Sequence, residues 1–413
     1  MSEWKEYKLV DVAIIVDCEH KTAPLVESSE FISVRTSNIS NGKIDFDNSN
    51  RVSETTYNEW SKRMGLVEGD VVLAREAPVG EVGWIPKNKK VCLGQRTVLI
   101  RVNKNTIDPK YLLFYLTNNE TKYDLISRST GSVVEHLNVK DIKNFEIRVH
   151  SSIEEQSAIA SILSSLDDKI DLLHRQNKTL EQLAETLFRQ WFIKEVDESW
   201  EKILLGELAD FQRGISYSGN LLGENGIGMP MHNLNSIDIN GSYKYKGIKF
   251  YTGEVKERQK LRAGDLLIIN TDITQDNRII GWPIFVPEKF EVSTFSHHLY
   301  STTLLNGKIS KLYLYFLLRQ RIYRETLASN ANGTTVSMLS KEAISNLEVR
   351  IPPESKRSQY EEIAKETFDK QTLNQKEIRT LTQLRDALLP KLMSGELRVC
   401  RNSAKKGAIL PYN

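Results

Sequence analysis

The chain contains a tandem repeat, and this constrains its fold more than any other feature of the sequence. Segments of the first half return in the second half in the same order. The six matching pairs are residues 4–13 with 200–209, 69–73 with 264–268, 83–84 with 281–282, 111–116 with 313–318, 131–134 with 333–336, and 145–149 with 347–351. Because six collinear matches do not arise by chance, the sequence predicts two copies of one unit of roughly 200 residues.

Each copy changes character along its length. Its first part has short apolar runs separated by Gly, Asn, Ser and Pro, a pattern typical of strands and turns. One helical segment follows late in each copy, at residues 109–118 and 311–328. The globular part of each copy is therefore predicted to be α+β.

The last part of each copy is predicted to be a long helix with apolar residues at seven-residue spacing. The predicted seam residues are Ile159, Leu166, Leu173, Leu180 and Leu187 in the first helix, and Leu381, Leu384 and Leu388 in the second. Sustained seven-residue spacing indicates a coiled coil. Pro390 is expected to end the second helix, because proline removes a backbone hydrogen bond inside a helix.

Two such helices in one chain are expected to pair antiparallel, which gives the molecule an internal pseudo-twofold repeat. The charges favour this pairing: residues 151–199 hold 10 acidic and 5 basic side chains, and residues 353–413 hold 8 and 12. The alternative is that each helix packs only on its own globular domain. A helix over residues 159–190 would be about 48 Å long, at 1.5 Å per residue.

The predicted domain boundaries follow from the repeat and from these changes of character. A chain of 413 residues is long enough for two or three domains. The predicted spans are a first globular domain at 1–150, a central helix at 151–199, a second globular domain at 200–352, a C-terminal helix at 353–398 and a tail at 399–413.

Composition excludes several classes of protein. No run reaches the roughly 18 apolar residues that cross a bilayer, and the N-terminus lacks the apolar core of a signal peptide, so no membrane partner is expected. Cys18, Cys92 and Cys400 lie too far apart for a local zinc or disulfide motif, which favours a reducing cytoplasm. The 56 basic and 54 acidic residues nearly balance, so charge alone does not indicate nucleic acid.

Motifs for catalysis are missing from the sequence. It has no GxxxxGK[ST] phosphate loop, no HExxH, no GxSxG and no Asn-Pro-Pro-aromatic run of an amino-methyltransferase. The adjacent pair His297-His298 is a poor metal site, since neighbouring side chains on a strand point to opposite faces. We therefore expect no catalytic centre, no metal site and no cofactor in this chain.

A binding function remains, and loops at equivalent places in the two copies carry different polar residues. Arg forks onto guanine and Asn or Gln pairs with adenine, so such differences would let the copies read different bases. The candidate DNA-binding residues are Arg35, Asn38, Arg75, Gln95, Arg96 and Arg128 in the first copy, and His232, Asn233, Asn235, Asn270, Arg278, His297 and His298 in the second. The alternative is that these residues are solvated loop positions or turn caps.

Several local strings resemble the DNA-specificity subunit of type I restriction–modification systems. They include VEGDVVLAREAPVGEVGWI, PKYLLFYL and RSTGSVVEHLNVKDIKNFEIRV in the first copy, and GTTVSMLSKEAISNLEVRIPP and LTQLRDALLPKLMSGELRV in the second. The resemblance covers nearly the whole chain. It implies two target-recognition domains that each read one half of a split site in double-stranded DNA, with the helices as a spacer.

The resemblance also implies partners that supply the chemistry. Modification subunits would dock on the helices and methylate adenine with S-adenosylmethionine, and restriction subunits would use ATP and Mg to translocate and cleave DNA. Helix length would then set the gap between half-sites. Arg75, Gln95 and Arg96 are assigned to one half-site, and Asn270, His297 and His298 to the other.

Two other functions stay open on the sequence. The chain could be a two-headed scaffold whose loops bind proteins, or a nuclease or methyltransferase acting alone, against which the missing motifs argue.

Overall fold

The structure is a computed structural model of the chain. It describes residues 3–129, 135–224, 226–238, 243–273, 277–333 and 336–399, and the backbone of 409–411. The predicted repeat at 131–134, residues 334 and 335 of its partner, and most of the predicted tail lie outside the described residues.

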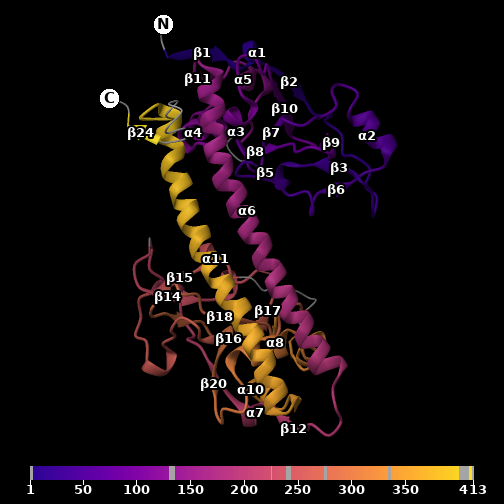
Figure 1. Cartoon of the computed structure of the whole chain (residues 1–413), viewed down its shortest axis with the longest axis vertical. Coiled ribbons are helices and arrows are strands. Elements are labelled where there is room, and N and C mark those ends of the chain that lie inside the picture. The colour runs from indigo at the N-terminus through magenta and orange to yellow at the C-terminus, as the bar shows by residue number, and fades with distance from the viewer. Residues whose placement is uncertain are drawn as a thin grey trace. The chain divides into compact units, whose positions relative to one another are not determined.

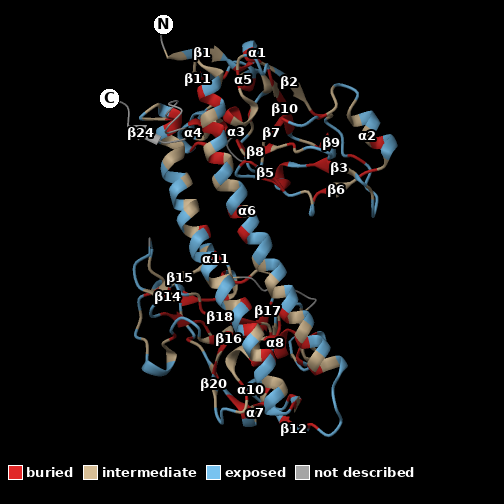
Figure 2. Cartoon of the chain, in the orientation of Figure 1, coloured by how far each residue is buried: buried red, intermediate tan, exposed pale blue. Residues whose placement is uncertain are grey.

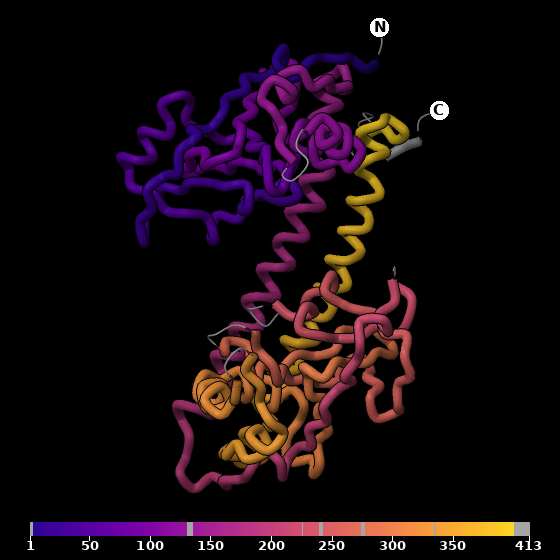
Figure 3. Tube along the Cα trace, turned by 180° about the vertical axis from the view of Figure 1, so that it is seen from behind, coloured from indigo at the N-terminus to yellow at the C-terminus, as the bar shows by residue number. Residues whose placement is uncertain are grey.

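The chain forms two compact units, and both long helices contribute to each of them. Unit 1 comprises residues 1–174 and 376–413, and unit 2 comprises residues 175–375. Both chain ends therefore belong to unit 1, where the indigo and yellow parts of the trace meet (Figure 3).

The core of unit 1 is built on an antiparallel sheet. Its strands are β2 (Ala13–Asp17), β10 (Thr97–Val102), β7 (Val71–Ala74) and β8 (Val82–Trp84), in that order. A second sheet has the order β6 (Asn50–Arg51), β3 (Phe31–Val34) and β9 (Lys90–Leu93), with β3 and β9 parallel. The remaining strands are the pair β1 (Trp4–Lys8) and β11 (Glu146–His150), the pair β4 (Ile39–Ser40) and β5 (Lys43–Ile44), and the pair β23 (Leu397–Val399) and β24 (Ile409–Pro411).

Short helices cover these sheets. They are α1 (Leu9–Val12), α2 (Glu54–Trp60), α3 (Pro109–Thr117), α4 (Asn119–Ser127) and α5 (Val139–Lys143). Helix α3 begins at Pro109 because the Asp108 carboxylate accepts hydrogen bonds from the backbone N–H groups of the first turn.

Unit 2 repeats most of this arrangement, with the same order of strands in its main sheet and in its second sheet. Its main sheet is β13 (Ala209–Arg213), β20 (Leu299–Leu304), β16 (Leu266–Ile269) and β18 (Pro283–Phe285), and its second sheet is β15 (Lys249–Tyr251), β14 (Met229–His232) and β19 (Thr294–Phe295), with β14 and β19 parallel. The other elements are β12 (Glu201–Leu204) paired with β22 (Glu348–Ile351), β17 (Thr271–Asp272) paired with β21 (Ser337–Met338), α7 (Leu205–Leu208), α8 (Lys311–Arg319), α9 (Arg321–Ser329) and α10 (Lys341–Ser345). The predicted tandem repeat and α+β class are confirmed.

The two long helices run antiparallel in both units. Helix α6 (Ile153–Arg189) ends in a π-helical turn at Gln190–Lys194, and helix α11 spans Glu354–Ser394. In unit 1, Ile170 and Leu173 of α6 pack against Ile378 of α11. In unit 2, the Tyr360 hydroxyl donates a hydrogen bond to the Ala184 carbonyl. Figure 1 shows the two ribbons, magenta and yellow, side by side within each unit.

Each long helix also completes the core of the unit formed by the other copy. Leu392 and Met393 at the end of α11 lie in the core of unit 1, and Phe188 and Phe192 at the end of α6 lie in the core of unit 2. The alternative that each helix packs only on its own domain is therefore wrong.

Both long helices carry buried, intermediate and exposed positions along their length (Figure 2), and the predicted seam residues differ in burial. Ile159 and Leu173 are buried; Leu166, Leu180, Leu187, Leu381 and Leu388 are half-buried; Leu384 is 45% exposed. Leu163, Ile170 and Ala184 form a second buried row on α6. Leu384 therefore lies outside the buried seam.

Pro390 does not end α11, contrary to the expectation from the sequence. The helix continues to Ser394, because Leu392 and Met393 bury their side chains in the core of unit 1 and one lost hydrogen bond near a helix end costs little. The helix ends instead at Gly395, which has φ +81°. A Cβ atom there would lie 2.4 Å from the Trp4 ring.

We predict that Gly395→Ala lowers the free energy of unfolding by about 2–3 kcal/mol, from the left-handed backbone and the clash with Trp4 together. The matched control is Gly264→Ala, since Gly264 has φ +82° and open space where a Cβ would lie. The control should lose only about 1 kcal/mol. Urea unfolding of both variants measures the difference, and equal losses would contradict a role for the contact with Trp4.

Candidate functional site

Four segments meet at the end of the central strands in each unit, and we call this region the loop junction. In unit 1 it comprises residues 17–20, 75–77, 94–96 and 135–137, joined by hydrogen bonds from the Arg75 N–H to the Arg96 carbonyl and from the Leu137 N–H to the Arg75 carbonyl. In unit 2 it comprises residues 213–217, 270–272, 296–298 and 337–339, and the Asn270 and Leu339 N–H groups make the same two bonds. Both junctions therefore share one backbone framework.

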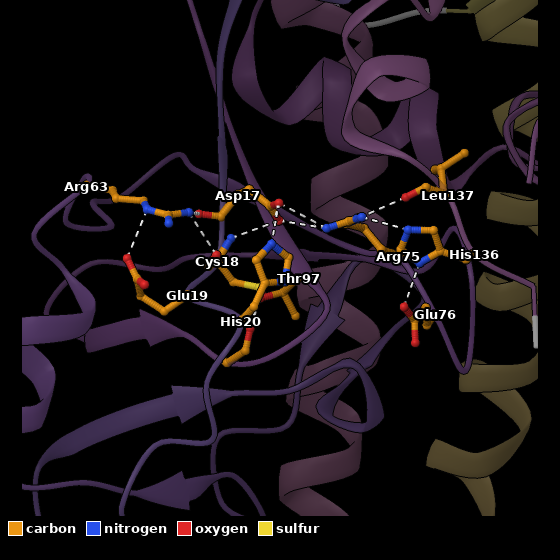
Figure 4. A network of polar contacts seen from close by, with 11 residues as sticks. Asp17, Cys18, Glu19, His20, Arg63, Arg75, Glu76, Thr97, His136 and Leu137 are labelled. Atoms are coloured by element: carbon orange, nitrogen blue, oxygen red, sulfur yellow. Dashed lines mark hydrogen bonds and ion pairs between the residues drawn. The ribbon is translucent and has the colours of Figure 1, made fainter.

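Arg75 is the centre of the junction in unit 1 (Figure 4). Its Nη1 lies 2.8 and 3.1 Å from the two carboxylate oxygens of Asp17, its Nε donates to the Leu137 carbonyl at 2.9 Å, and its Nη2 lies 2.8 Å from His136 Nε2. The residue is only 6% exposed. Its guanidinium is thus engaged within the protein, and this geometry does not fit the predicted contact with bases.

The outer part of the same network is accessible. His136 Nδ1 lies 2.6 Å from Glu76 Oε1, and Glu76 Oε2 lies 2.8 Å from the Nε of Arg96, whose side chain is 57% exposed. Gln95 beside it is half-buried. Arg96 has φ +65°, a left-handed backbone conformation that is strained for a residue other than glycine. The turn that carries Gln95 and Arg96 therefore holds a strained backbone.

The junction in unit 2 has the same framework but different side chains. Asn270 replaces Arg75: it is fully buried, and its amide donates to the His297 carbonyl at 3.1 Å. The Arg213 Nε donates to the same carbonyl at 3.0 Å. Asn270 is therefore a structural residue as well.

His297 and His298 occupy the places of Gln95 and Arg96 in unit 2. Both are half-buried, and their ring centroids are 3.9 Å apart. Burial, followed by the charge of His297, lowers the pKa of His298 to about 4, so its ring is neutral near pH 7. Tyr217 lies edge-on to His297, and the Lys249 ammonium donates to the Tyr217 hydroxyl at 3.1 Å.

A second candidate region is the corner after β3 and β14. Asn38 is buried, accepts from the Arg35 N–H at 3.0 Å and donates to the Asn48 carbonyl at 3.2 Å. In unit 2, Asn233 is buried and caps the turn by accepting from the Asn235 N–H at 2.9 Å. The two buried amides hold the corner, while Arg35 and Asn235 are exposed.

His232 is fully buried at this corner. Its ring nitrogens lie 2.6 Å from the Tyr243 hydroxyl and 2.9 Å from the Ser293 hydroxyl. Burial lowers its pKa to about 3. The residue is therefore a neutral core histidine and not a surface reader.

The last two candidates are arginines outside these regions. Arg128 pairs with Asp124 at 3.3 Å and lies over the Phe145 ring at 4.9 Å, and Arg278 is exposed in the loop before β18. The predicted residues with accessible side chains are thus Arg35, Gln95, Arg96, Arg128, Asn235, Arg278, His297 and His298.

Several residues beside the junctions were not among those predicted to contact bases. In unit 1, Asp17, Glu76 and His136 surround Arg75, and in unit 2 a pocket of about 520 Å³ is lined by Arg213, Tyr300, Asn332, Met338, Ser340 and Lys341. Arg213 aligns with Asp17 at the end of the first strand of the main sheet, so the repeat places both residues at the junction. No signal in one sequence identifies the others.

Two kinds of feature are absent from the described residues. Among them, no group of three or more His, Cys, Asp and Glu side chains could hold a metal ion. In the same part of the chain, no helix is long and apolar enough to cross a membrane.

We predict that Arg75→Ala destabilises the protein by about 3 kcal/mol, because it removes one partner of a buried ion pair and leaves Asp17 without its arginine. Arg96→Ala, which removes an exposed ion pair, should change stability by less than about 1 kcal/mol. Thermal unfolding of both variants measures this. An Arg75→Ala variant as stable as the wild type would contradict the structural role of Arg75, and Arg75 would again be a candidate for contact with bases.

We also predict that acid destabilises the protein through His232. Its pKa is about 3 in the folded chain and 6.5 in a free side chain, so the unfolded state binds the extra proton first. Stability should fall as the pH drops below about 6.5, by about 2 kcal/mol at pH 5 from this group alone. The slope should flatten in His232→Gln and persist in His20→Gln, whose side chain is exposed. Urea unfolding at several pH values tests this, and equal slopes in all three proteins would exclude His232 as the cause.

Comparison with known proteins gives consistent matches over most of the chain. The model of the type I restriction modification DNA specificity domain matches twice, at residues 1–182 and 197–383. A type I restriction enzyme specificity subunit of Methanocaldococcus jannaschii is 28% identical, with 84% of this chain and 82% of that protein covered. A specificity subunit of Haemophilus influenzae is 21% identical, with 96% and 100% covered. The crystal structure of an S subunit from M. genitalium aligns with a TM-score of 0.58 at 17% identity, covering 94% of this chain and 96% of that one.

Proposed function

The chain belongs to the type I restriction modification DNA specificity family, and we propose that it is the subunit that selects the DNA sequence in such a system. It is the non-catalytic component, in keeping with relatives that are specificity subunits of restriction enzymes. Each unit reads one half of a two-part target in double-stranded DNA.

One observation carries this proposal: the two loop junctions share a backbone framework and differ in their accessible side chains. Gln95 and Arg96 stand where His297 and His298 stand in unit 2, on turns held by equivalent hydrogen bonds. A protein that recognises two different half-sites needs this combination, because the common backbone positions the side chains at the DNA and the side chains select the base. The buried Arg75 and Asn270 keep the loops in place.

The chemistry of these side chains suits base recognition. An arginine can donate two hydrogen bonds to guanine, and the glutamine amide can pair with adenine. The neutral ring of His298 can donate or accept a hydrogen bond without adding charge. Further candidates for base contacts are Arg35 and Asn235, at the corner after β3 and β14. Candidates for phosphate contacts are Arg128 and Arg278.

The small net charge of +2 indicates that this chain alone holds DNA weakly. Modification subunits that bind DNA on either side would supply the remaining affinity. Such subunits would bring S-adenosylmethionine for adenine methylation, and restriction subunits would bring ATP and Mg. The assembly would act in the cytoplasm.

The long helices offer matching surfaces for two modification subunits. In unit 1, Leu172 of α6 and Leu384 of α11 are 42% and 45% exposed, and in unit 2 Leu183 and Leu373 are 48% and 59% exposed. Each leucine of α6 has its counterpart 201 residues later in α11. Two equivalent leucine pairs, one in each unit, suit two copies of one partner. The length of the helices would set the gap between half-sites.

We predict that the variant Gln95→Ala/Arg96→Ala loses selectivity in one half of the target and that His297→Ala/His298→Ala loses it in the other. The measurement is the map of methylated adenines in cells that carry each variant with its partner subunits. Lys104→Ala is the control and should leave both halves unchanged, because Lys104 is an exposed cation after β10, at the opposite end of that strand from the junction residues 94–96. The loss of one good bidentate contact should relax discrimination by about 10- to 100-fold at the affected base pair.

Loss of selectivity in both halves from either double variant would mean that the junctions act structurally. An unaltered map in both variants would exclude them as readers. If the purified assembly neither methylates nor binds duplex DNA but retains protein partners, the chain is a scaffold and the proposal fails.

A further inference from the structure

The contact between the long helices has a polar pair in unit 2. Asn374 of α11 is fully buried, and its Nδ2 donates to Oδ1 of Asn177 on α6 at 2.8 Å. The Asn177 Nδ2 in turn lies 3.4 Å from the Gln371 carbonyl. Asn374 Oδ1 has no hydrogen-bond partner among the described residues. A buried amide that lacks part of its hydrogen bonds lowers the stability of the fold. Stability therefore does not explain why asparagines occupy this contact.

The internal repeat supplies the matching contact in unit 1. The helices correspond at an offset of 201 residues, which pairs the buried Leu163 with Ala364 and the core residue Phe192 with Met393. At the same offset, Leu173 corresponds to Asn374 and Asn177 corresponds to Ile378. Leu173 and Ile378 pack together in an apolar cluster in unit 1. One contact is therefore apolar with apolar, and its counterpart is polar with polar.

This arrangement matters because the two helices have nearly the same shape. In an antiparallel pair of two α6 helices from different chains, each Asn177 would face Leu173 of the other helix. In a pair of two α11 helices, each Asn374 would face Ile378. Both pairings between chains would bury two amides against apolar side chains, whereas the pairing within one chain buries none against them.

A charged contact acts in the same direction. Arg385 of α11 lies 2.9 Å from Asp167 of α6 in unit 1. At the offset of 201 residues, Arg385 corresponds to Ala184. A pair of two α6 helices would therefore place Asp167 opposite alanine, and the ion pair would be lost.

We propose that Asn177 and Asn374 direct α6 to pair with α11 of its own chain and prevent equivalent helices of two chains from pairing with each other. A polar residue inside a helix seam selects the partner at a cost in stability, because every mismatched pairing leaves its amide without a partner. The proposal concerns assembly of the chain and does not depend on DNA recognition.

Exchanging residues between the helices tests the proposal at constant composition. The variant L173N/N374L places two asparagines on α6 and none at these positions of α11. Asparagine then faces an apolar residue in both contacts within the chain, while two α6 helices from different chains would match asparagine with asparagine. We expect this variant to form dimers or larger assemblies at concentrations where the wild-type chain is monomeric, with at least a tenfold shift in the midpoint of association.

The matched control moves the polar pair instead of splitting it. The variant L173N/N374L/N177I/I378N has the same composition, but its two asparagines, at positions 173 and 378, now face each other in unit 1. The apolar side chains at positions 177 and 374 face each other in unit 2. This variant should have the same mass as the wild-type chain at equal concentration, a result that would exclude a general effect of buried substitutions. Light scattering after size-exclusion chromatography of the full-length chains gives the masses.

Equal association of the two variants would overturn the proposal, as would a monomeric, folded L173N/N374L chain. If L173N/N374L fails to fold, N177I/N374L provides the second test. This variant makes all four contact positions apolar, so it should melt at a higher temperature and yet associate between chains. A higher melting temperature without association would also overturn the proposal.

Discussion

The fold depends on the exchange of helix ends between the two copies of the repeat. The core of unit 1 contains Leu392 and Met393 from the end of the last helix, and the core of unit 2 contains Phe188 and Phe192 from the end of the central helix. Neither globular part closes its core with its own copy alone. This buried apolar surface, and not helix propensity, keeps two long and mostly exposed helices antiparallel within each unit.

The loop junctions combine a fixed backbone frame with side chains that differ between the two units. The backbone bonds that hold the loop junctions are the same in both units, and they do not involve the accessible side chains at positions 95, 96, 297 and 298. The residues that replace one another inside the frame, Arg75 and Asn270, are both satisfied by neighbouring groups. In the proposed function, changes at these four positions would alter the sequence that each unit binds and leave the backbone frame intact.

The sequence was sufficient for the repeat, the fold class and the pairing of the helices, because repeated strings and seven-residue spacing are local signals. It could not distinguish residues with side chains free to contact DNA from residues that hold the loops in place. Arg75 was predicted to contact bases because arginine pairs with guanine and because the second copy has a different polar residue, Asn270, at the equivalent position. The burial of its guanidinium depends on Asp17 and Leu137, which lie far away in the chain. Pro390 misled for a related reason: whether a proline ends a helix depends on what the next residues pack against, here the core of the first repeat.

The contact of Gly395 with Trp4 has a topological consequence. The end of the last helix lies against the first strand, and the Val399 N–H donates to the Glu155 carboxylate at 3.2 Å. Unit 1 is therefore closed by contacts between residues that are separated by most of the sequence. Contacts of such long range form slowly, because the chain entropy of closing a long loop is lost before the contacts stabilise the unit.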